Sequence, residues 1–151
     1  LDIDIREHNK KEILNNPFSK YIEMLEGSSI DDSIINKVHN IAKNFKKILI
    51  FLDSNHTHEH VLEELNAYAN LTSVGSYIVV FDTVIDYLPE NHLPNESNPS
   101  MSEARTYTKG NSPMSAVREF LKDNKNFKIV SEIDSKLLIS VAPEGYLKRI
   151  S

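Results

Sequence analysis

The pattern of apolar and polar residues divides the chain into alternating strands and helices. Residues 1–5 alternate apolar and acidic side chains, with the period of a strand, and residues 21–25 form a second short strand pattern. Two unbroken apolar runs, 48–52 and 77–81, are typical of strands buried on both faces of a parallel sheet. Helical spacing of apolar residues predicts helices over 6–15, 31–45, 57–69 and 112–121.

The C-terminal part predicts an antiparallel pair. Residues 127–133 and 137–142 have strand patterns, and the three residues between them suit a hairpin. Residues 145–149 are interpreted as a turn, an apolar anchor and a basic tail. The whole order predicts one α/β domain over 1–151, with a mostly parallel sheet, helices on both faces and a C-terminal antiparallel hairpin.

Two segments do not fit this alternation. Residues 86–112 are rich in Pro, Asn and Ser, and a loop of that length in a compact domain is either functional or disordered. The chain also opens inside a strand-like pattern, without Met or a polar lead-in, so we expect a further segment in front of Leu1.

Composition restricts the class of protein. The 151 residues are 40% hydrophobic and 26% charged, as in an ordinary soluble domain. A net charge of −5 without a basic run argues against nucleic-acid binding. No apolar run approaches the roughly 18 residues of a membrane span, and no signal peptide is visible. The absence of cysteine excludes disulfides and thiolate metal sites. We therefore expect a cytoplasmic protein that binds neither nucleic acid nor membrane.

Acidic residues end three of the predicted strands. They are Asp2 or Asp4, Asp53 and Asp82. In open α/β sheets, ligands bind outside the carboxyl ends of the strands. Grouped carboxylates repel one another unless a cation or hydroxyl groups lie between them, and Mg²⁺ is commonly held by one or two carboxylates. The alternative is that these residues simply begin loops.

The segment after Asp53 carries three histidines at alternate positions, His56, His58 and His60. If the helix has already begun there, His56 and His60 share one face. Imidazoles are common ligands of zinc and iron, and histidine can serve as a general base because it titrates near neutral pH. The alternative is an exposed helix start with incidental histidines. Gly27-Ser28-Ser29 allows a flat ring to lie against the backbone, but any turn has the same composition.

A resemblance makes these alternatives more specific. Asp53-Ser54-x-His56-x-x-x-His60-Val61-x-x-Glu64-Leu65 resembles a signature of the cephalosporin hydroxylase-like family. The segments 1–6, 26–29, 75–83, 116–121 and 137–149 are similar to other parts of the same family. The resemblance covers nearly the whole chain apart from residues 86–112.

The resemblance implies a Rossmann-like methyltransferase fold that uses S-adenosylmethionine, often with magnesium. By this resemblance we expect the first strand and the glycine-rich loop of that fold to be missing from these 151 residues. By this resemblance Asp2 holds the ribose hydroxyls with Asp4 behind it, Asp53 and Asp82 bind Mg²⁺, and the adenine is framed by Gly27, Ser28, Ser29 and Ile30. Relatives carry an acid just before Asp82, whereas this chain has Phe81, which removes one protein ligand.

The resulting expectation is an O-methyltransferase for a sugar or another small molecule with a hydroxyl group, as a homo-oligomer. His56 or His60 is the expected base, and residues 86–112 the expected lid over the acceptor. The first rival is a truncated, non-catalytic domain that does not bind the cofactor. The second rival is a His-dependent metallohydrolase or oxygenase.

Overall fold

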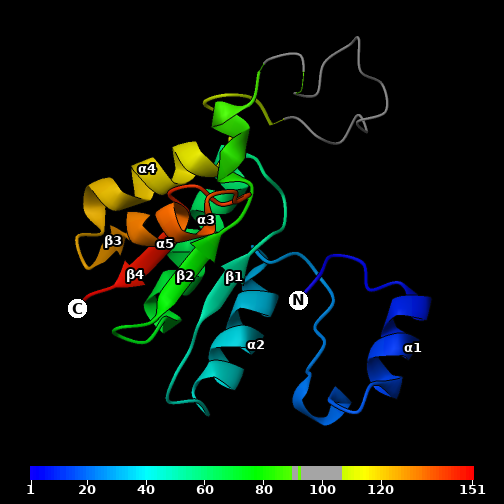
Figure 1. The fold of residues 1–151 in the computed structure, drawn as a ribbon. Helices are drawn as coiled ribbons and strands as arrows, with labels where there is room; N and C mark the ends of the chain where they lie inside the picture. The colour runs from blue at the N-terminus through cyan, green and yellow to red at the C-terminus, as the bar shows by residue number, and fades with distance from the viewer. Residues whose placement is uncertain (90–91, 93–106) are drawn as a thin grey trace.

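A four-stranded mixed sheet forms the centre of the protein (Figure 1). The computed structural model describes residues 1–89, 92 and 107–151. Across the sheet the strands are β1 (Ile50–Leu52), β2 (Tyr77–Val80), β4 (Tyr146–Arg149) and β3 (Phe127–Ile129). β1 and β2 are parallel, whereas β4 is antiparallel to both of its neighbours. The expected α/β class is confirmed, but the described sheet has one parallel pair and two antiparallel pairs, so it is not mostly parallel.

Four of the predicted helices are present. They are α1 (Glu7–Asn15), α2 (Asp32–Ala42), α3 (His58–Tyr68) and α4 (Pro113–Asp123). α4 begins as its sequence predicts: Ser112 is the N-cap, Pro113 follows it, and the Ser112 and Ser115 side chains form a capping box. Short 3₁₀ turns lie at η1 (Ser19–Tyr21), η2 (Ala69–Leu71) and η3 (Thr83–Tyr87).

The strand register explains which face of the sheet carries the core. Ile50, Ile78, Leu147 and Ile129 lie opposite one another across the four strands, so their side chains share one face. α3 and α4 cover this face with buried residues such as Leu65 and Val117. The apolar faces of α3 and α4 and the inward-facing side chains of the strands therefore pack into one cluster. This packing fixes the positions of the ends of β1 and β2.

The predicted C-terminal hairpin is wrong. Residues 131–137 form helix α5 (Ser131–Leu137) instead of a strand and turn, and residues 138–142 do not pair in the sheet. The partner of β3 is β4, which lies in the segment interpreted as a basic tail. The apolar pattern that suggested a strand is exposed: Leu138 and Ile139 are 87% and 92% accessible. The sequence pattern did not indicate β4, because it ends in two charged residues, Lys148 and Arg149, which are only partly buried.

The two predicted N-terminal strands are also wrong. Residues 1–5 contribute one parallel bridge, between Asp2 and Glu26, and residues 21–25 contribute none; Leu1 and Ile3 are exposed. The alternating pattern lacks a neighbouring strand on which to build a ladder. The expectation that 48–52 is buried on both faces is wrong as well, because Phe51 is 59% exposed.

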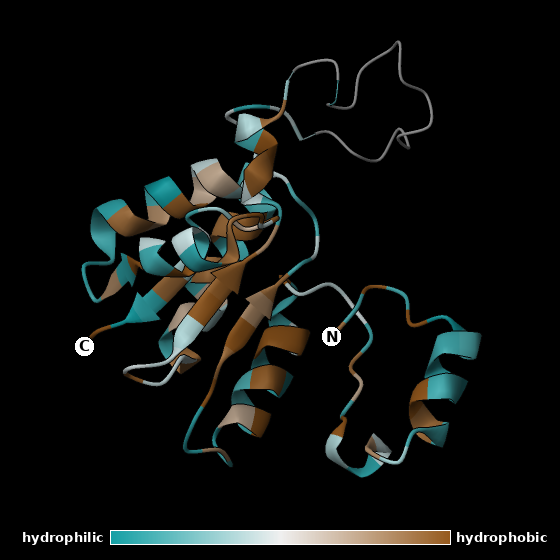
Figure 2. Cartoon of the chain, viewed as in Figure 1, coloured by the Kyte–Doolittle hydropathy of each residue, from teal (hydrophilic) through white to brown (hydrophobic). Residues whose placement is uncertain are grey.

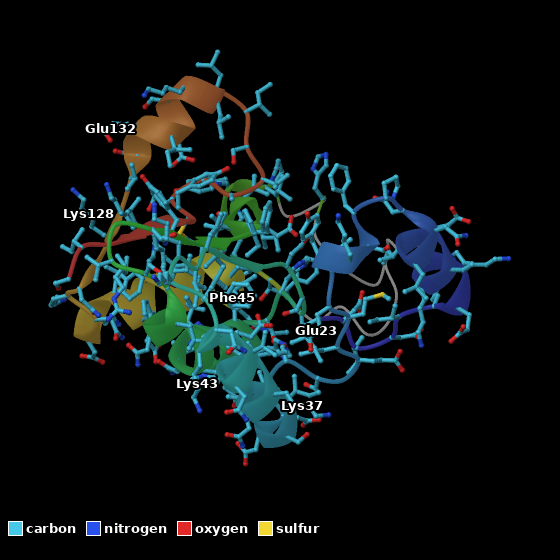
Figure 3. All side chains as sticks on the ribbon, turned by 90° about the horizontal axis from the view of Figure 1, so that it is seen from below. Glu23, Lys37, Lys43, Phe45, Lys128 and Glu132 are labelled. Carbon is cyan, nitrogen blue, oxygen red and sulfur yellow. The ribbon has the colours of Figure 1, made fainter. Side chains whose placement is uncertain are left out.

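The first 31 residues form an arm beside the sheet. α1 has no buried residue, and Figure 1 shows it set apart from the sheet while α2 lies beside β1. In Figure 2 the strands β1 and β2 are hydrophobic along their length, whereas α1 is largely hydrophilic. In Figure 3, Lys37 and Lys43 lie at the α2 side of the molecule and Lys128 and Glu132 at the opposite side. Within the described ranges, no helix combines the length and apolarity needed to cross a bilayer.

The expected lid lies mostly outside the described residues. Its described ends are anchored by Asp86, whose carboxylate accepts hydrogen bonds from the Ser112 hydroxyl (2.6 Å) and the Gly110 N–H (3.2 Å). These bonds bring the two ends of the 86–112 segment together beside the start of α4.

We predict that Gly145→Ala destabilises the domain. A Cβ at this position would lie 2.2 Å from the Val80 carbonyl oxygen, at the point where the chain enters β4. Overpacking of this kind typically costs about 1–3 kcal/mol. Chemical denaturation of the two proteins measures the difference. Gly75→Asn is the control, because a Cβ there meets nothing within 4 Å and asparagine tolerates the positive φ. Equal stability of Gly145→Ala and the unsubstituted chain would contradict this account of the β2–β4 contact.

Candidate functional site

The ends of β1 and β2 bring two carboxylates and one imidazole together. Asp53 directly follows β1, and Asp82 lies two residues beyond β2. His56 Nε2 lies 3.0 Å from Asp82 Oδ2 and 3.6 Å from Asp53 Oδ1. One ligand atom from each of the three residues falls within 4.8 Å of the others. Parallel pairing therefore unites two residues that are 29 positions apart in the sequence (82 − 53).

Asp82 has an unusual backbone conformation. Its φ of 54° and ψ of 20° place a non-glycine residue in the left-handed region. Aspartate is among the residues that occupy this region most readily, yet the conformation is uncommon. It ends β2 abruptly, and the following chain enters η3 at once. Strained residues cluster at functional sites, so this conformation supports a role for Asp82 beyond simply starting a loop.

His56 belongs to the loop before α3 and not to the helix. The Asn55 side chain accepts a hydrogen bond from the Thr57 N–H (3.1 Å), and α3 begins one residue later at His58. On its other side the His56 ring contacts the buried Tyr107 ring, with centroids 5.6 Å apart. His56 Nε2 is buried and makes no hydrogen bond, so the short approach to Asp82 lacks hydrogen-bond alignment.

A positive charge would be stabilised by this arrangement. Two carboxylates and an imidazole nitrogen lie close together, and a cation placed between them would be attracted to all three ligand atoms. The carboxylates of Asp53 and Asp82 fit Mg²⁺, which prefers oxygen ligands. The imidazole of His56 suits a transition metal better. The donor set therefore fits a divalent cation, with His56 as a third ligand or as an adjacent base.

A cavity of about 1160 Å³ opens beside this group. Asp53 and His56 lie on its wall, together with four of the residues expected to bind the cofactor: Asp2, Gly27, Ser28 and Ser29. The apolar part of the wall comes from α2 and from the free side of β1, where it includes Val38, Ile41, Phe45, Leu49 and Phe51. A cavity with an apolar wall and a few polar groups is the usual form of a small-molecule site.

The other two expected cofactor residues lie outside the cavity lining. Asp4 is exposed, and its N–H donates a hydrogen bond to Asp2 Oδ1 at 3.3 Å. Ile30 follows the Gly27–Ser29 turn but does not line the cavity. Asp82 does not line the cavity either; it contacts His56, which does.

The structure separates the two candidate histidines. His56 and His60 would share a helical face if the helix had begun at His56, but α3 begins at His58, so His56 lies outside it. His60 Nε2 contacts Ser29 Oγ at 3.1 Å and lies 3.6 Å from Glu64 Oε1. His58 instead contacts α4, through Ser115 Oγ at 2.7 Å and Glu119 Oε2 at 3.3 Å. Of the three histidines, His56 is the one that joins the acidic group.

Several polar residues of this region were not singled out as site residues from the sequence. Tyr107 packs on His56, and the Ser54 hydroxyl donates to Glu64 Oε1 at 2.7 Å. Glu64 is only 2% exposed, and the Tyr68 hydroxyl donates to the Ser29 carbonyl at 2.5 Å. Glu64 and Tyr68 had a usable signal, since they follow His60 at intervals of four on α3.

Comparison with known proteins gives a consistent result. The sequence model of the family described as Rhamnosyl O-methyltransferase/CmcI matches residues 1–150. A rhamnosyl O-methyltransferase of Mycobacterium tuberculosis H37Rv is 30% identical over 127 residues, which cover 83% of this chain and 46% of the relative. A Mycobacterium bovis BCG protein of the same name matches to the same extent. The chain therefore spans about half the length of these relatives. No solved structure matches it significantly.

We predict that Tyr68 makes stability depend on alkaline pH. Burial, and secondly the nearby Glu64 carboxylate, raise the pKa of Tyr68 from 10.0 to about 12. Because the folded pKa exceeds the unfolded one, the stabilisation is fully present below pH 10 and is lost as the pH rises through about 12.

Denaturation from pH 8 to 12 tests this with Tyr68→Phe, which keeps the ring and removes the hydroxyl. At pH 8 the variant should be less stable by about 1 kcal/mol. The difference should shrink above pH 10, since only the unsubstituted chain has this group to titrate. A constant difference across the range would show that the Tyr68 hydroxyl does not titrate as described.

Proposed function

The chain belongs to the rhamnosyl O-methyltransferase/CmcI family, and on this premise we propose that it forms the catalytic part of a sugar O-methyltransferase. The proposed reaction moves the methyl group of S-adenosylmethionine to a hydroxyl group of a sugar or a related small molecule. The observation that carries the proposal is the convergence of Asp53, His56 and Asp82 at the edge of a cavity that also contains Asp2 and the Gly27–Ser29 turn.

The cavity residues fit the cofactor. Asp2 has a carboxylate on the cavity wall that would accept hydrogen bonds from ribose hydroxyls, as acids do in nucleotide-binding α/β folds. The Gly27–Ser29 turn would lie against the adenine, since Gly27 has no side chain and Ser29 has a small polar one. S-adenosylmethionine, when bound, supplies the methyl group.

Asp53 and Asp82 would hold Mg²⁺, and the ion, when bound, lowers the pKa of a hydroxyl that it contacts. We assign to His56 the role of the base that takes the proton from the acceptor hydroxyl. Its Nε2 lies beside both carboxylates and has no hydrogen bond of its own. The Tyr107 ring holds the imidazole on its other side. His60 is less suited to this role, because its contacts are with Ser29 and Glu64.

The His-dependent metallohydrolase or oxygenase is supported by one observation, the imidazole in the metal-ligand group. Sites of that kind commonly use two histidines with one carboxylate. Among the described residues, this group has one histidine with two carboxylates. The composition of the group therefore favours magnesium-assisted methyl transfer.

The open side of β1 supports the expectation of a further strand. In the part of the chain that the structure describes, β1 is hydrogen-bonded to β2 alone, and its other side faces the cavity. Leu49 and Phe51, which alternate with the core-facing Ile50, are exposed on the opposite face of β1, so the surface next to this open edge is apolar. We infer that in the whole protein a strand in Rossmann-like order covers this edge, and that the isolated chain associates with copies of itself there. The non-catalytic alternative follows if the cofactor needs that strand.

We predict that Asp53→Asn and Asp82→Asn abolish divalent-cation binding without unfolding the domain. Each substitution removes a charged ligand from the edge of the sheet, and asparagine tolerates the left-handed conformation of Asp82. Calorimetric titration with Mg²⁺ and, separately, Zn²⁺ measures binding. Asp123→Asn, an exposed position at the end of α4, is the matched control. Mg²⁺ binding that survives both substitutions would remove these residues from the metal site, and a preference for Zn²⁺ would favour the hydrolase or oxygenase.

We predict that the 151-residue chain self-associates and that Leu49→Lys reduces the association. A lysine on an edge strand opposes pairing with another chain. Light scattering over a concentration series measures the mass. Val74→Lys replaces another exposed apolar residue away from the cavity lining and should leave the association unchanged. A chain that remains monomeric at all concentrations would show that this edge needs no partner.

A further inference from the structure

Three polar side chains form a line along α3. His60, Glu64 and Tyr68 follow at intervals of four, so they lie on one face, and all three line the cavity. This face is unusual because Glu64 and Tyr68 are 2% and 4% exposed. A carboxylate is rarely buried to this degree unless neighbouring groups hold it.

The first and last of these side chains, those of His60 and Tyr68, both form a hydrogen bond with Ser29. His60 Nε2 contacts the Ser29 hydroxyl at 3.1 Å, and the Tyr68 hydroxyl donates to the Ser29 carbonyl at 2.5 Å. Ser29 is thus fixed both through its side chain and through its backbone. The Gly27–Ser29 turn therefore takes its position from α3, although 31 residues separate Ser29 from His60.

The position of Glu64 favours a proton on the nearer ring nitrogen of His60, Nε2. Glu64 Oε1 lies 3.6 Å from His60 Nε2 and accepts a hydrogen bond from the Ser54 hydroxyl. A carboxylate can only accept hydrogen bonds, so it favours an N–H at the nearby Nε2 over a lone pair. With its proton on Nε2, His60 donates to Ser29 Oγ. The hydroxyl proton of Ser29 is then not used in this contact and remains available to the cavity.

We propose that Glu64 and His60 are positioning residues that make Ser29 a hydrogen-bond donor to a ring nitrogen of a purine nucleoside. This inference rests on the proposed function, which gives the cavity an adenosyl ligand. It assigns His60 to recognition of the ligand and not to proton transfer. It also gives the buried Glu64 a specific role, because its carboxylate accepts from Ser54 and favours an N–H at His60 Nε2, which directs the His60–Ser29 hydrogen bond.

The first test does not depend on any ligand. The ¹⁵N chemical shifts of the His60 imidazole distinguish a proton on Nε2 from a proton on Nδ1. We expect Nε2–H in the full 151-residue chain. In Glu64→Gln the new amide can donate to Nε2, so the proton should move toward Nδ1. Nδ1–H in the unsubstituted chain, or no change in Glu64→Gln, would overturn the proposal.

The second test measures binding of S-adenosylhomocysteine by calorimetry. His60→Leu and Glu64→Gln should each weaken binding about tenfold, or about 1.4 kcal/mol. His60→Gln should restore it, because the glutamine amide nitrogen can take the place of Nε2–H. Glu63→Gln makes the same charge change at an exposed neighbouring position and should bind as the unsubstituted chain does.

Deaza analogues of the ligand, in which CH replaces one ring nitrogen, test which ring nitrogen accepts the hydrogen bond from Ser29. Ser29→Ala should weaken binding of S-adenosylhomocysteine but not of the analogue in which CH replaces the contacted ring nitrogen. A loss that is equal for every analogue would overturn the donor role. If the unsubstituted chain binds no S-adenosylhomocysteine, the proposed function fails together with the nucleoside part of this inference. The imidazole shifts then still decide whether Glu64 sets the protonation of His60.

Discussion

The parallel register of β1 and β2 is the constraint on which the candidate site depends. Ile50 lies opposite Ile78 and Leu52 opposite Val80, so both strands reach the same edge of the sheet together. Helix α3 makes the connection between them, and its apolar face shares the core with Leu52 and Val80. A shift of this register by one residue would turn those side chains out of the core and move Asp53 away from Asp82. The energy that stabilises the core therefore also holds together the two carboxylates.

Sequence patterns predicted those parts of the fold whose signals are local. The Ser112-Pro113 start of α4 and the apolar runs of β1 and β2 are examples, because capping and burial depend on neighbouring residues. The patterns failed where the outcome depended on a distant partner. Leu137 to Ala142 has the composition of a strand but does not pair in the described sheet, whereas the polar Lys148 pairs with Lys128 and Tyr77 inside it. No local signal distinguishes these cases.

The candidate site shows the same division. Acids that follow buried strands were identifiable, because the edge of a parallel sheet is fixed by topology, and Asp53 and Asp82 do lie together. The roles of the histidines were not separable by spacing, since three residues at alternate positions point in different directions once α3 begins at His58. Tyr107 was not identifiable either, because its contact with His56 depends on how the chain returns after residue 106.

The two walls of the cavity differ in how firmly they are built. One wall consists of the sheet edge, α2 and the Gly27–Ser29 turn, which α3 holds, whereas the other contains Asp2, from an arm whose helix α1 has no buried residue. A molecule that contacts both walls would stabilise the domain, because it would join the arm to the core. Its binding free energy would then include the cost of ordering the arm. By linkage, the bound molecule would in turn protect the arm from local opening. The fraction of chains with an occupied cavity and the fraction with an ordered arm would then rise and fall together.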